Sequence, residues 1–158
     1  MVARLAEELR MTRAFACPEE EAMLSVVRTA EVLAQRVASL LKSFDLSANQ
    51  YNVLRILRGS SETGLTCGQI GERMISRDPD ITRLLDRLES RQLIARQRSD
   101  EDRRVVVSRI TPAGLSLLRE MDPEILSYNK QCFKNFGAKK LRQLIELLEQ
   151  ARADVTGK

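Results

Sequence analysis

Residues 66–110 read TCGQIGERMISRDPDITRLLDRLESRQLIARQRSDEDRRVVVSRI, and this stretch decides the fold. Thr66 and Gln69 have the spacing of a capping box and predict a short helix, which a sharp turn connects to a second helix. Two β-favouring runs, residues 93–98 and 105–110, follow and are joined by a charged tip, which predicts a hairpin. Helix, turn, helix and hairpin in this order are the layout of a winged helix-turn-helix, so DNA binding is the first hypothesis.

The positive charge of the chain is concentrated in the same stretch. Ten of the 26 lysine and arginine residues lie between Arg73 and Arg109 together with seven acidic residues, so this segment carries +3 of the net charge of +4. All ten are arginines, whose planar guanidinium suits bidentate contact with a phosphate or a guanine edge. A charge run is often only a solvated face, but these charges fall on a recognisable motif and therefore favour a polyanionic partner.

The second helix of the motif is the predicted recognition helix. Asp78 is its expected N-cap, and Pro79 fits the first turn, where its missing N–H costs nothing. Four apolar residues at helical spacing form the expected buried stripe: Ile81, Leu84, Leu85 and Leu88. The same spacing leaves four polar residues on the other faces of the helix, where a partner can reach them: Thr82, Arg83, Asp86 and Arg87.

Long amphipathic helices are expected at both ends of the chain. Cys17-Pro18 followed by three glutamates predicts a helix start, with proline in the first turn and acids near the positive end of the helix dipole. An apolar seam then runs along this helix through Val26, Ala30, Leu33, Val37, Leu40 and Phe44. A second seam near the C-terminus contains Leu141, Leu144, Leu148, Ala151 and Val155. Such long seams need a partner, either the central module or a second copy of the chain, and we favour a homodimer.

Further start and stop signals divide the chain. Ser47 and Gln50 form another expected capping box, and residues 59–64 end the helix that follows. Thr111-Pro112 is expected to open a helix after the hairpin, and Pro123 is expected to kink or restart that helix near Asp122.

The predicted fold is mostly α with a small β-hairpin, a winged helix-turn-helix with N- and C-terminal dimerisation helices. Its expected parts are an N-terminal arm (1–16), a dimerisation helix (17–45), the winged helix-turn-helix DNA-binding module (46–110) and C-terminal dimerisation helices (111–158).

The composition argues against several classes of site. The 158-residue chain has no histidine, which removes histidine-based nucleophiles, imidazole bases and histidine metal ligands. No phosphate-binding glycine loop is present, so we expect no enzyme, no cofactor and no metal site. No stretch approaches the ~20 apolar residues of a membrane span, and charges interrupt the N-terminus where a signal peptide needs an apolar core. With three widely spaced cysteines, we expect a cytoplasmic protein without a disulfide framework.

Four short motifs occur in a fixed order between residues 81 and 114: ITRLLDRLE at 81–89, Leu93-Ile94, DRR at 102–104 and VSRITPAG at 107–114. In this order and spacing they resemble the MarR family of transcriptional regulators. The resemblance implies a bacterial homodimer that binds a pseudo-palindromic operator in double-stranded DNA, most often as a repressor.

The resemblance also implies which residues meet DNA. In this family the helix that here contains residues 81–88 enters the major groove, and a wing arginine reaches the flanking minor groove. Carried over, Arg104 is the minor-groove contact, Asp102 its orienting partner, and Arg103 a phosphate contact or the alternate minor-groove contact. The other predicted DNA-binding residues are Ser76, Arg77, Thr82, Arg83 and Arg87.

Two alternatives stay open for these side chains. Asp102 and Arg104 can form an exposed ion pair that only closes the hairpin, and such a pair contributes little to stability. Arg87 can pair with Asp86 or Glu89 on its own module and stay off the DNA.

Control by a small phenolic or other aromatic anion is a further implication of the resemblance. The candidate lining residues are Val37, Leu41, Phe44, Tyr51 and Arg55, although core packing is the plainer interpretation of the apolar ones. Some relatives sense hydroperoxides through a cysteine near the first long helix, and Cys17 lies in that region without a neighbouring tyrosine; Cys67 and Cys132 are the other thiols. A cysteine-based redox-sensing regulator and a winged-helix protein-interaction module therefore remain the alternatives.

Overall fold

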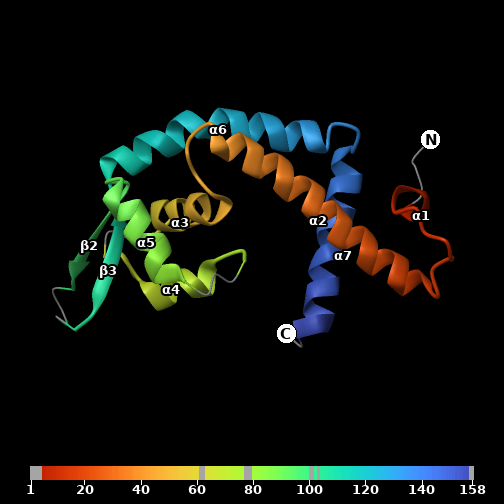
Figure 1. Cartoon of the computed structure of the whole chain (residues 1–158), viewed down its shortest axis with the longest axis horizontal. Coiled ribbons are helices and arrows are strands. Elements are labelled where there is room, and N and C mark those ends of the chain that lie inside the picture. Colours follow the sequence, from red (N-terminus) through yellow and green to blue (C-terminus); the bar gives the residue numbers. More distant parts are fainter. Residues whose placement is uncertain (1–4, 61–62, 77–79, 100–101, 103, 157–158) are drawn as a thin grey trace. The chain divides into compact units, whose positions relative to one another are not determined.

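The computed structural model describes residues 5–60, 63–76, 80–99, 102 and 104–156 (Figure 1). These residues are mostly helical and contain a small antiparallel sheet. The chain forms two compact units, residues 1–114 and 115–158. Within the described ranges, no helix combines the length and the apolar character that crossing a bilayer requires.

Helices α1 (Leu5–Glu8) and α2 (Pro18–Lys42) begin the first unit. Helix α2 starts where the sequence predicts, with proline in its first turn, although Cys17 at the N-cap makes no side-chain capping bond. Glu8 and Arg28 link the two helices through an ion pair of 2.7 Å between partly exposed side chains. The apolar seam of α2 is unevenly covered, because Val26 is 48% exposed whereas Leu33 and Val37 are half-buried.

The winged module follows in the same unit and consists of α3 (Ala48–Arg58), β1 (Leu65–Thr66), α4 (Cys67–Arg73), α5 (Ile81–Ser90), β2 (Ile94–Arg98) and β3 (Val106–Ile110). Both predicted capping boxes are confirmed: the Ser47 hydroxyl accepts from the N–H of Gln50, the Thr66 hydroxyl accepts from that of Gln69, and each glutamine side chain accepts a bond in return. These bonds satisfy N–H groups that a helix start otherwise leaves unpaired.

The predicted hairpin is confirmed, and each of its strands is one residue shorter than expected. Strand β1 adds a short third strand that pairs antiparallel with Val107 and Ser108 of β3, which gives the order β1-β3-β2. A two-residue strand carries no periodic signal, so the sequence did not reveal it.

Apolar residues of α3, α4 and α5 share one core with the sheet. Each of the following side chains is less than a tenth exposed: Val53, Leu54, Leu57, Leu65, Ile70, Leu84, Leu85, Leu88, Leu93, Ile94 and Val107. Full burial of a side chain of this size stabilises the fold by roughly 1.5–3 kcal/mol. The core therefore fixes α5 against the rest of the module and leaves its polar faces outside.

The segment after β3 is tied back to the loop that leaves α5. The Thr111 N–H donates to the Leu93 carbonyl at 3.1 Å, and the Thr111 hydroxyl donates to the Gln92 carbonyl at 2.7 Å. The same hydroxyl accepts from the Gly114 N–H at 3.1 Å, in the manner of the cap predicted here. A Cβ on residue 114 would collide with the Leu93 carbonyl oxygen, so this approach requires glycine.

The second unit consists of α7 (Ala138–Thr156) and of α6 (Pro112–Cys132) from residue 115 onward. The predicted break near Asp122 is wrong, because α6 continues through Pro123. A proline inside a helix costs roughly 3 kcal/mol. The buried side chains of Leu118, Met121 and Ile125 lie on both sides of it, and their burial offsets that cost.

Candidate DNA-binding surface

The N-terminus of α5 is capped by a different residue from the one predicted. Asp80, directly before the first helical residue, accepts the N–H of Arg83 through its Oδ1 at 3.1 Å. The assignment of this role to Asp78 is therefore wrong, and Asp78, Pro79 and the predicted contact Arg77 lie outside the described residues. Either aspartate has the chemistry of a cap, and the helix start at Ile81 selects Asp80.

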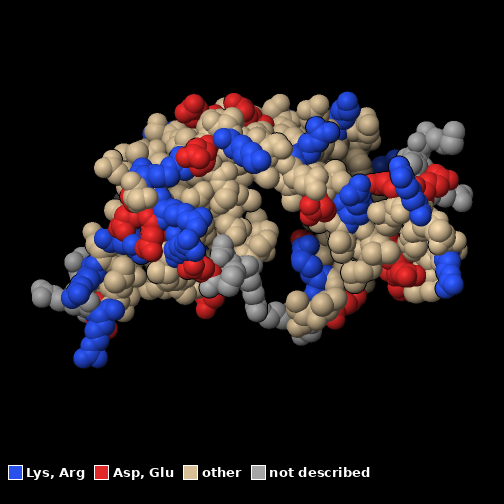
Figure 2. Space-filling view, viewed as in Figure 1, with Lys and Arg blue, Asp and Glu red and all other residues tan. Residues whose placement is uncertain are grey.

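The faces of α5 are divided as its periodicity predicts. Leu84, Leu85 and Leu88 are buried and Ile81 is half-buried, which confirms the apolar stripe. The polar residues between them are exposed: Thr82, Arg83, Asp86 and Arg87. Figure 2 shows basic side chains over α5 and at the end of the β2–β3 hairpin, with acidic side chains among them.

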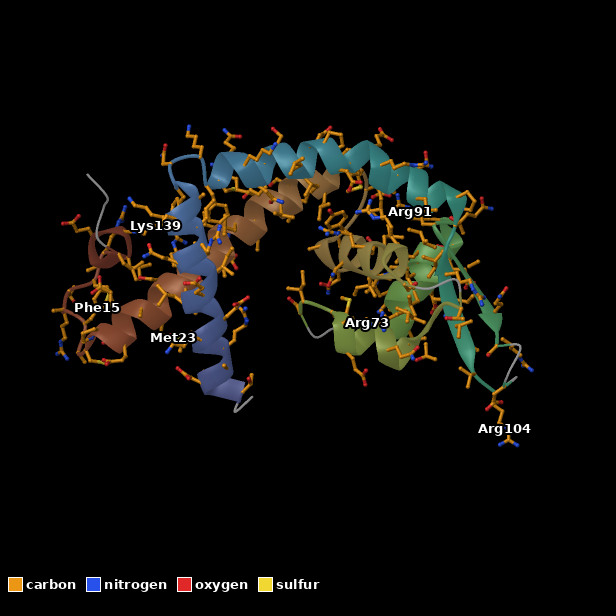
Figure 3. The ribbon with its side chains drawn as sticks, turned by 180° about the vertical axis from the view of Figure 1, so that it is seen from behind. Phe15, Met23, Arg73, Arg91, Arg104 and Lys139 are labelled. Atoms are coloured by element: carbon orange, nitrogen blue, oxygen red, sulfur yellow. The ribbon has the colours of Figure 1, made fainter. Side chains whose placement is uncertain are left out.

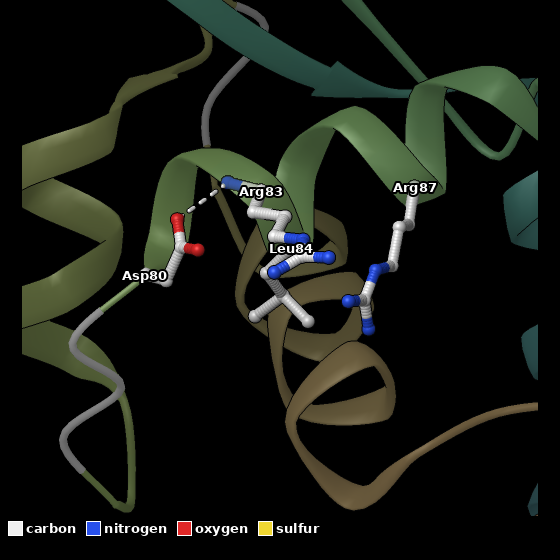
Figure 4. Close-up of a pocket in the computed structure, with 4 residues that line it drawn as sticks. All are labelled: Asp80, Arg83, Leu84 and Arg87. Atoms are coloured by element: carbon white, nitrogen blue, oxygen red, sulfur yellow. Dashed lines mark hydrogen bonds between the residues drawn. The ribbon is translucent and has the colours of Figure 1, made fainter.

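A hollow of about 220 Å³ lies beside α5 (Figure 4). Asp80, Arg83, Leu84 and Arg87 line it, so its wall combines two guanidinium groups with a carboxylate and an apolar side chain. One carboxylate oxygen of Asp80 already accepts the capping bond. The hollow therefore offers several donors and a small apolar contact to a partner that approaches α5.

Arg96 of β2 binds both acidic residues of α5. Its Nη2 lies 2.6 Å from Asp86 Oδ1 and 2.6 Å from Glu89 Oε2, and its Nε donates to Glu89 Oε2 at 2.8 Å. The side-chain hydrogen bond from Arg96 holds the pKa of Glu89 below its ordinary value, and the same bond raises the pKa of Arg96. We call these three residues the Arg96 cluster; no sequence signal identified it.

The Arg96 cluster decides one alternative left open by the sequence. Asp86 and Glu89 both pair with Arg96, and within the described residues neither forms the alternative pair with Arg87. In the described part of the chain, neither Arg83 nor Arg87 forms a salt bridge. Both guanidinium groups therefore remain available at the hollow.

At the hairpin tip, the Asp102 carboxylate binds the backbone of Arg104 and not its side chain. Its Oδ1 accepts the N–H of Arg104 at 2.9 Å, and the Val105 N–H donates to the Asp102 carbonyl at 2.9 Å. No ion pair between Asp102 and Arg104 occurs in the described structure, so the pairing that would only close the hairpin is not formed there. Arg104 stands at the free end of the hairpin (Figure 3), and Arg103 lies outside the described residues.

Ile75, two residues after the end of α4, is held by a side chain that the sequence did not single out. The Asn52 side chain of α3 accepts the N–H of Ile75 at 2.8 Å. Ile75 is 90% exposed, and the predicted contact Ser76 beside it is exposed as well. The Cys67 sulfur of α4 lies 3.9 Å from the Thr82 hydroxyl of α5.

The candidate effector residues lie where α2 meets α3, and several of them pack in the core. Leu41 and Tyr51 are buried, and the Arg55 guanidinium lies 5.9 Å from the centre of the Tyr51 ring. Val37 and Phe44 are half-buried. These contacts agree with the packing interpretation of the apolar residues.

Arg91, at the end of α5, connects it to the same corner. It donates to the carbonyls of Asp45 and of Phe44, the latter at 3.3 Å, and its Nη2 lies 3.7 Å from Asp45 Oδ2. Sequence reasoning could not find this contact, because the partners lie 46 and 47 positions apart.

All three cysteines are free thiols. Cys17 is exposed, and its thiol contributes, after the backbone N–H of Glu19, to holding the pKa of Glu19 below its ordinary value. No group of three metal-binding side chains occurs among the described residues.

Comparisons with known proteins identify the family of this chain. The family model described as MarR family matches residues 46–106, which contain α3 through the start of β3. A crystal structure of a MarR transcription factor from Planctomyces limnophilus is 37% identical, with a TM-score of 0.66, over 87% of this chain and 99% of that one. The chain belongs to the MarR family. It is thus a DNA-binding transcriptional regulator of that family.

The chain is also similar to a curated repressor in sequence and to a DNA-bound protein in fold. The HTH-type transcriptional repressor IacR of Pseudomonas putida is 29% identical over 73% of this chain and 68% of its own length. The structure of the S. aureus MepR–DNA complex matches the fold with a TM-score of 0.76 at 20% identity, over 84% of this chain and 96% of that one. MepR is bound to DNA in that structure. In the present chain, the exposed face of α5 and the hairpin tip form the candidate DNA-binding surface.

Proposed function

We propose that this MarR-family chain is a repressor that binds a pseudo-palindromic operator as a homodimer. The observation that carries the proposal is the arrangement of cations on the module. Arg83 and Arg87 flank the hollow on α5 without a salt bridge in the described structure, and Arg104 stands at the hairpin tip. Duplex DNA is the ligand that matches this arrangement: its phosphates are negatively charged, and its two grooves can accept the arginines of α5 and the arginine of the hairpin tip.

In this proposal, α5 enters the major groove. Arginine contacts guanine O6 and N7 in a bidentate manner, and a threonine hydroxyl bonds to several base edges or to a phosphate. Arg83 and Thr82 are accordingly the base or backbone contacts, and Arg87 is a phosphate contact. Ser76 and, from the sequence alone, Arg77 add phosphate contacts at the turn before α5.

The hairpin is proposed to lie along the flanking minor groove. Arg104 is the inserted side chain, because a narrow A·T-rich minor groove attracts arginine through its enhanced negative potential. Asp102 has a supporting role: its bond to the Arg104 N–H shapes the tip and leaves the guanidinium to the DNA. Arg103 remains a proposed phosphate contact on the sequence argument.

Dimerisation is proposed because each unit carries exposed apolar side chains on a long helix. In the first unit these are Met23, Val26 and Val27 of α2; in the second they are Ile145, Leu147 and Val155 of α7. A second copy of the chain would cover such residues and would place two copies of α5 on successive half-sites.

Release by a small aromatic anion is the regulatory part of the proposal. It rests on the family resemblance together with the position of the exposed Arg55 beside the Tyr51 ring, which supplies a cation and an aromatic surface. Redox control through Cys17 is not favoured, because no tyrosine accompanies this thiol in the neighbouring sequence.

The test is a selection of genomic fragments with the purified protein at near-physiological salt, followed by competition between the recovered site and scrambled duplex. We expect an inverted repeat with half-sites about one helical turn apart, bound at least ~10³-fold more tightly than scrambled DNA. Arg104→Ala should weaken this binding by about tenfold or more, and Lys130→Ala, which removes an exposed charge from α6, should not. Absence of an enriched site, with binding that disappears as salt rises, would support a protein-interaction module instead.

A further inference from the structure

The Arg96 cluster joins the two parts of the module that are proposed to touch DNA. Arg96 lies in β2, the first strand of the hairpin, and its partners Asp86 and Glu89 lie on α5. We infer that Arg96 is a positioning residue that holds the hairpin against α5, so that Arg104 meets the minor groove while α5 occupies the major groove. The inference rests on the proposed function, because it assumes that both elements contact one DNA duplex.

The geometry of the cluster restricts how the hairpin can sit. Both oxygens of Glu89 are used by one residue: Oε2 receives the Arg96 side chain, and Oε1 accepts the Arg96 backbone N–H at 3.1 Å. Asp86 holds the same guanidinium from the preceding turn of α5 at 2.6 Å. Because the guanidinium is planar and contacts two carboxylates through Nη2 and Nε, its orientation relative to α5 is set.

The place of Arg96 in the sheet makes this link consequential. The strand order is β1-β3-β2, so β2 is an edge strand, and β1 supports β3 at Val107 and Ser108 alone. Glu89 therefore takes a backbone N–H that a neighbouring strand would otherwise receive. The hairpin beyond these residues is a two-stranded ribbon that carries Arg104 at its end. Such a ribbon has little stability of its own, and a fixed base limits how far its tip can deviate.

A positioning role of the Arg96 cluster and a purely electrostatic effect of its acids on DNA binding predict different results. Arg96 is only 25% exposed at its side chain, which places it between the helix and the strand and not on an open face. Asp86 and Glu89 bring two negative charges to a helix that is proposed to approach phosphates, and Arg96 neutralises only one of them. If charge alone mattered, removal of the acids should tighten DNA binding. If they hold Arg96 and the hairpin in place, their removal should weaken it.

The first experiment is a double-mutant cycle on the selected operator, measured at one salt concentration and at a temperature where every variant is folded. In the wild type, Arg104→Ala is expected to weaken specific binding by about tenfold. In an Arg96→Gln background, Arg104→Ala should weaken binding by less than about threefold. A hairpin that Arg96 does not hold loses conformational entropy when Arg104 binds DNA, so the Arg104 contact contributes less to the affinity. The Arg104→Ala penalty is the ratio of two dissociation constants measured in the same background. Partial unfolding caused by Arg96→Gln would change both constants by the same factor, and it therefore cancels in the ratio.

Arg98→Gln is the matched control, since Arg98 is an exposed arginine of the same strand and lies outside the cluster. In that background the Arg104→Ala penalty should keep its wild-type value. An equal penalty in the wild-type and Arg96→Gln backgrounds would overturn the positioning role of Arg96. A wild-type penalty of zero would instead overturn the proposed wing contact, and with it this inference.

The second experiment uses the variant Asp86→Asn/Glu89→Gln, which removes two negative charges and retains the shapes of both side chains. We expect specific binding to weaken by about threefold or more, against the direction that charge removal alone produces. Binding to scrambled duplex should tighten, because it depends on charge and not on simultaneous contact in two grooves. Tighter binding to the operator as well would assign Asp86 and Glu89 a purely electrostatic role and would exclude positioning.

Discussion

Helices α5 and α2 are both amphipathic, but they bury their apolar faces to different extents. The stripe of α5 is covered within its own module: Leu84, Leu85 and Leu88 are all buried. In α2, Val26 of the predicted seam and its neighbour Val27 are about half exposed, at 48% and 56%. Helical periodicity reports which face is apolar, whereas the identity of the covering partner depends on the whole fold. The apolar face of α5 is thus covered when a single chain folds, whereas the exposed apolar residues of α2 can be covered by a second chain.

The largest expected effect tests this difference directly. Leu88→Ala should lower the free energy of unfolding by about 2–5 kcal/mol, because it leaves a cavity in the module core. Val26→Ala, which truncates a half-exposed side chain, should lower it by less than about 1 kcal/mol. Urea unfolding followed by circular dichroism at low protein concentration measures both values. Equal losses would show that the two helices do not differ in the way described.

A charge placed on the exposed face of α2 separates association from folding. Val26→Glu should raise the dimer dissociation constant by at least about tenfold, because a carboxylate in an apolar interface loses its hydration. The melting temperature of the dissociated chain should stay nearly the same. Ser39→Glu introduces the same charge at an exposed polar position of α2 and serves as the control. Analytical ultracentrifugation provides the measurement, and an unchanged dimer would remove Val26 from the interface.

The N-termini of helices α5 and α2 also differ, and a smaller effect on stability is expected there. Asp80 makes a side-chain capping bond at the start of α5, whereas Cys17 makes none at the start of α2. Asp80→Ala should therefore lower the free energy of unfolding by about 1 kcal/mol, and Cys17→Ala should leave it nearly unchanged. Chemical denaturation of both variants decides the point; a loss at Cys17 as large as that at Asp80 would contradict it.

The smallest expected effect concerns acid pH. The pKa of Glu89 in α5 is lowered in the folded state, chiefly by the Arg96 hydrogen bond. Such a group stabilises the fold above its unfolded pKa of about 4.3, and this contribution is lost as the pH falls through the lower folded value. Glu89→Gln should thus be less stable than the wild type at neutral pH, and the difference should shrink below about pH 4.

The control for this prediction is Glu19→Gln in α2. The pKa of Glu19 is also lowered, first by its own backbone N–H and then by Cys17, but this residue is exposed. Its effect on the pH dependence of unfolding should be smaller than that of Glu89. A difference between Glu89→Gln and the wild type that stays constant from pH 7 to acid would show that the carboxylate charge contributes nothing.

Local signals predicted most of the elements of this chain. The capping boxes at Ser47 and Thr66, the start of α2 at Pro18 and the hairpin strands follow from bonds and periodicities that span a few residues. Such signals are legible because both partners of each interaction are neighbours in the chain. The family motifs between residues 81 and 114 added the functional class, which the comparisons support.

The signals failed where several local solutions compete. Asp78 and Asp80 both have the chemistry of a cap, and the observed helix start favours Asp80. Pro123 predicts a break, but the burial of Leu118 and Met121 on the same helix outweighs the cost of one lost hydrogen bond. For Pro123 the deciding energy comes from packing, which the order of residues does not display.

By itself, the sequence determined the helices, the hairpin, the apolar stripe of α5 and the polar residues left on its surface, because these depend on spacing along one element. The tertiary structure alone decided which charges are engaged and which are available. Arg96 binds Asp86 and Glu89, and Arg91 binds the backbone at Asp45, across separations that carry no periodic signal. Any arginine of the module is chemically able to form such a pair, and only the folded geometry brings one of them within bonding distance of the acids.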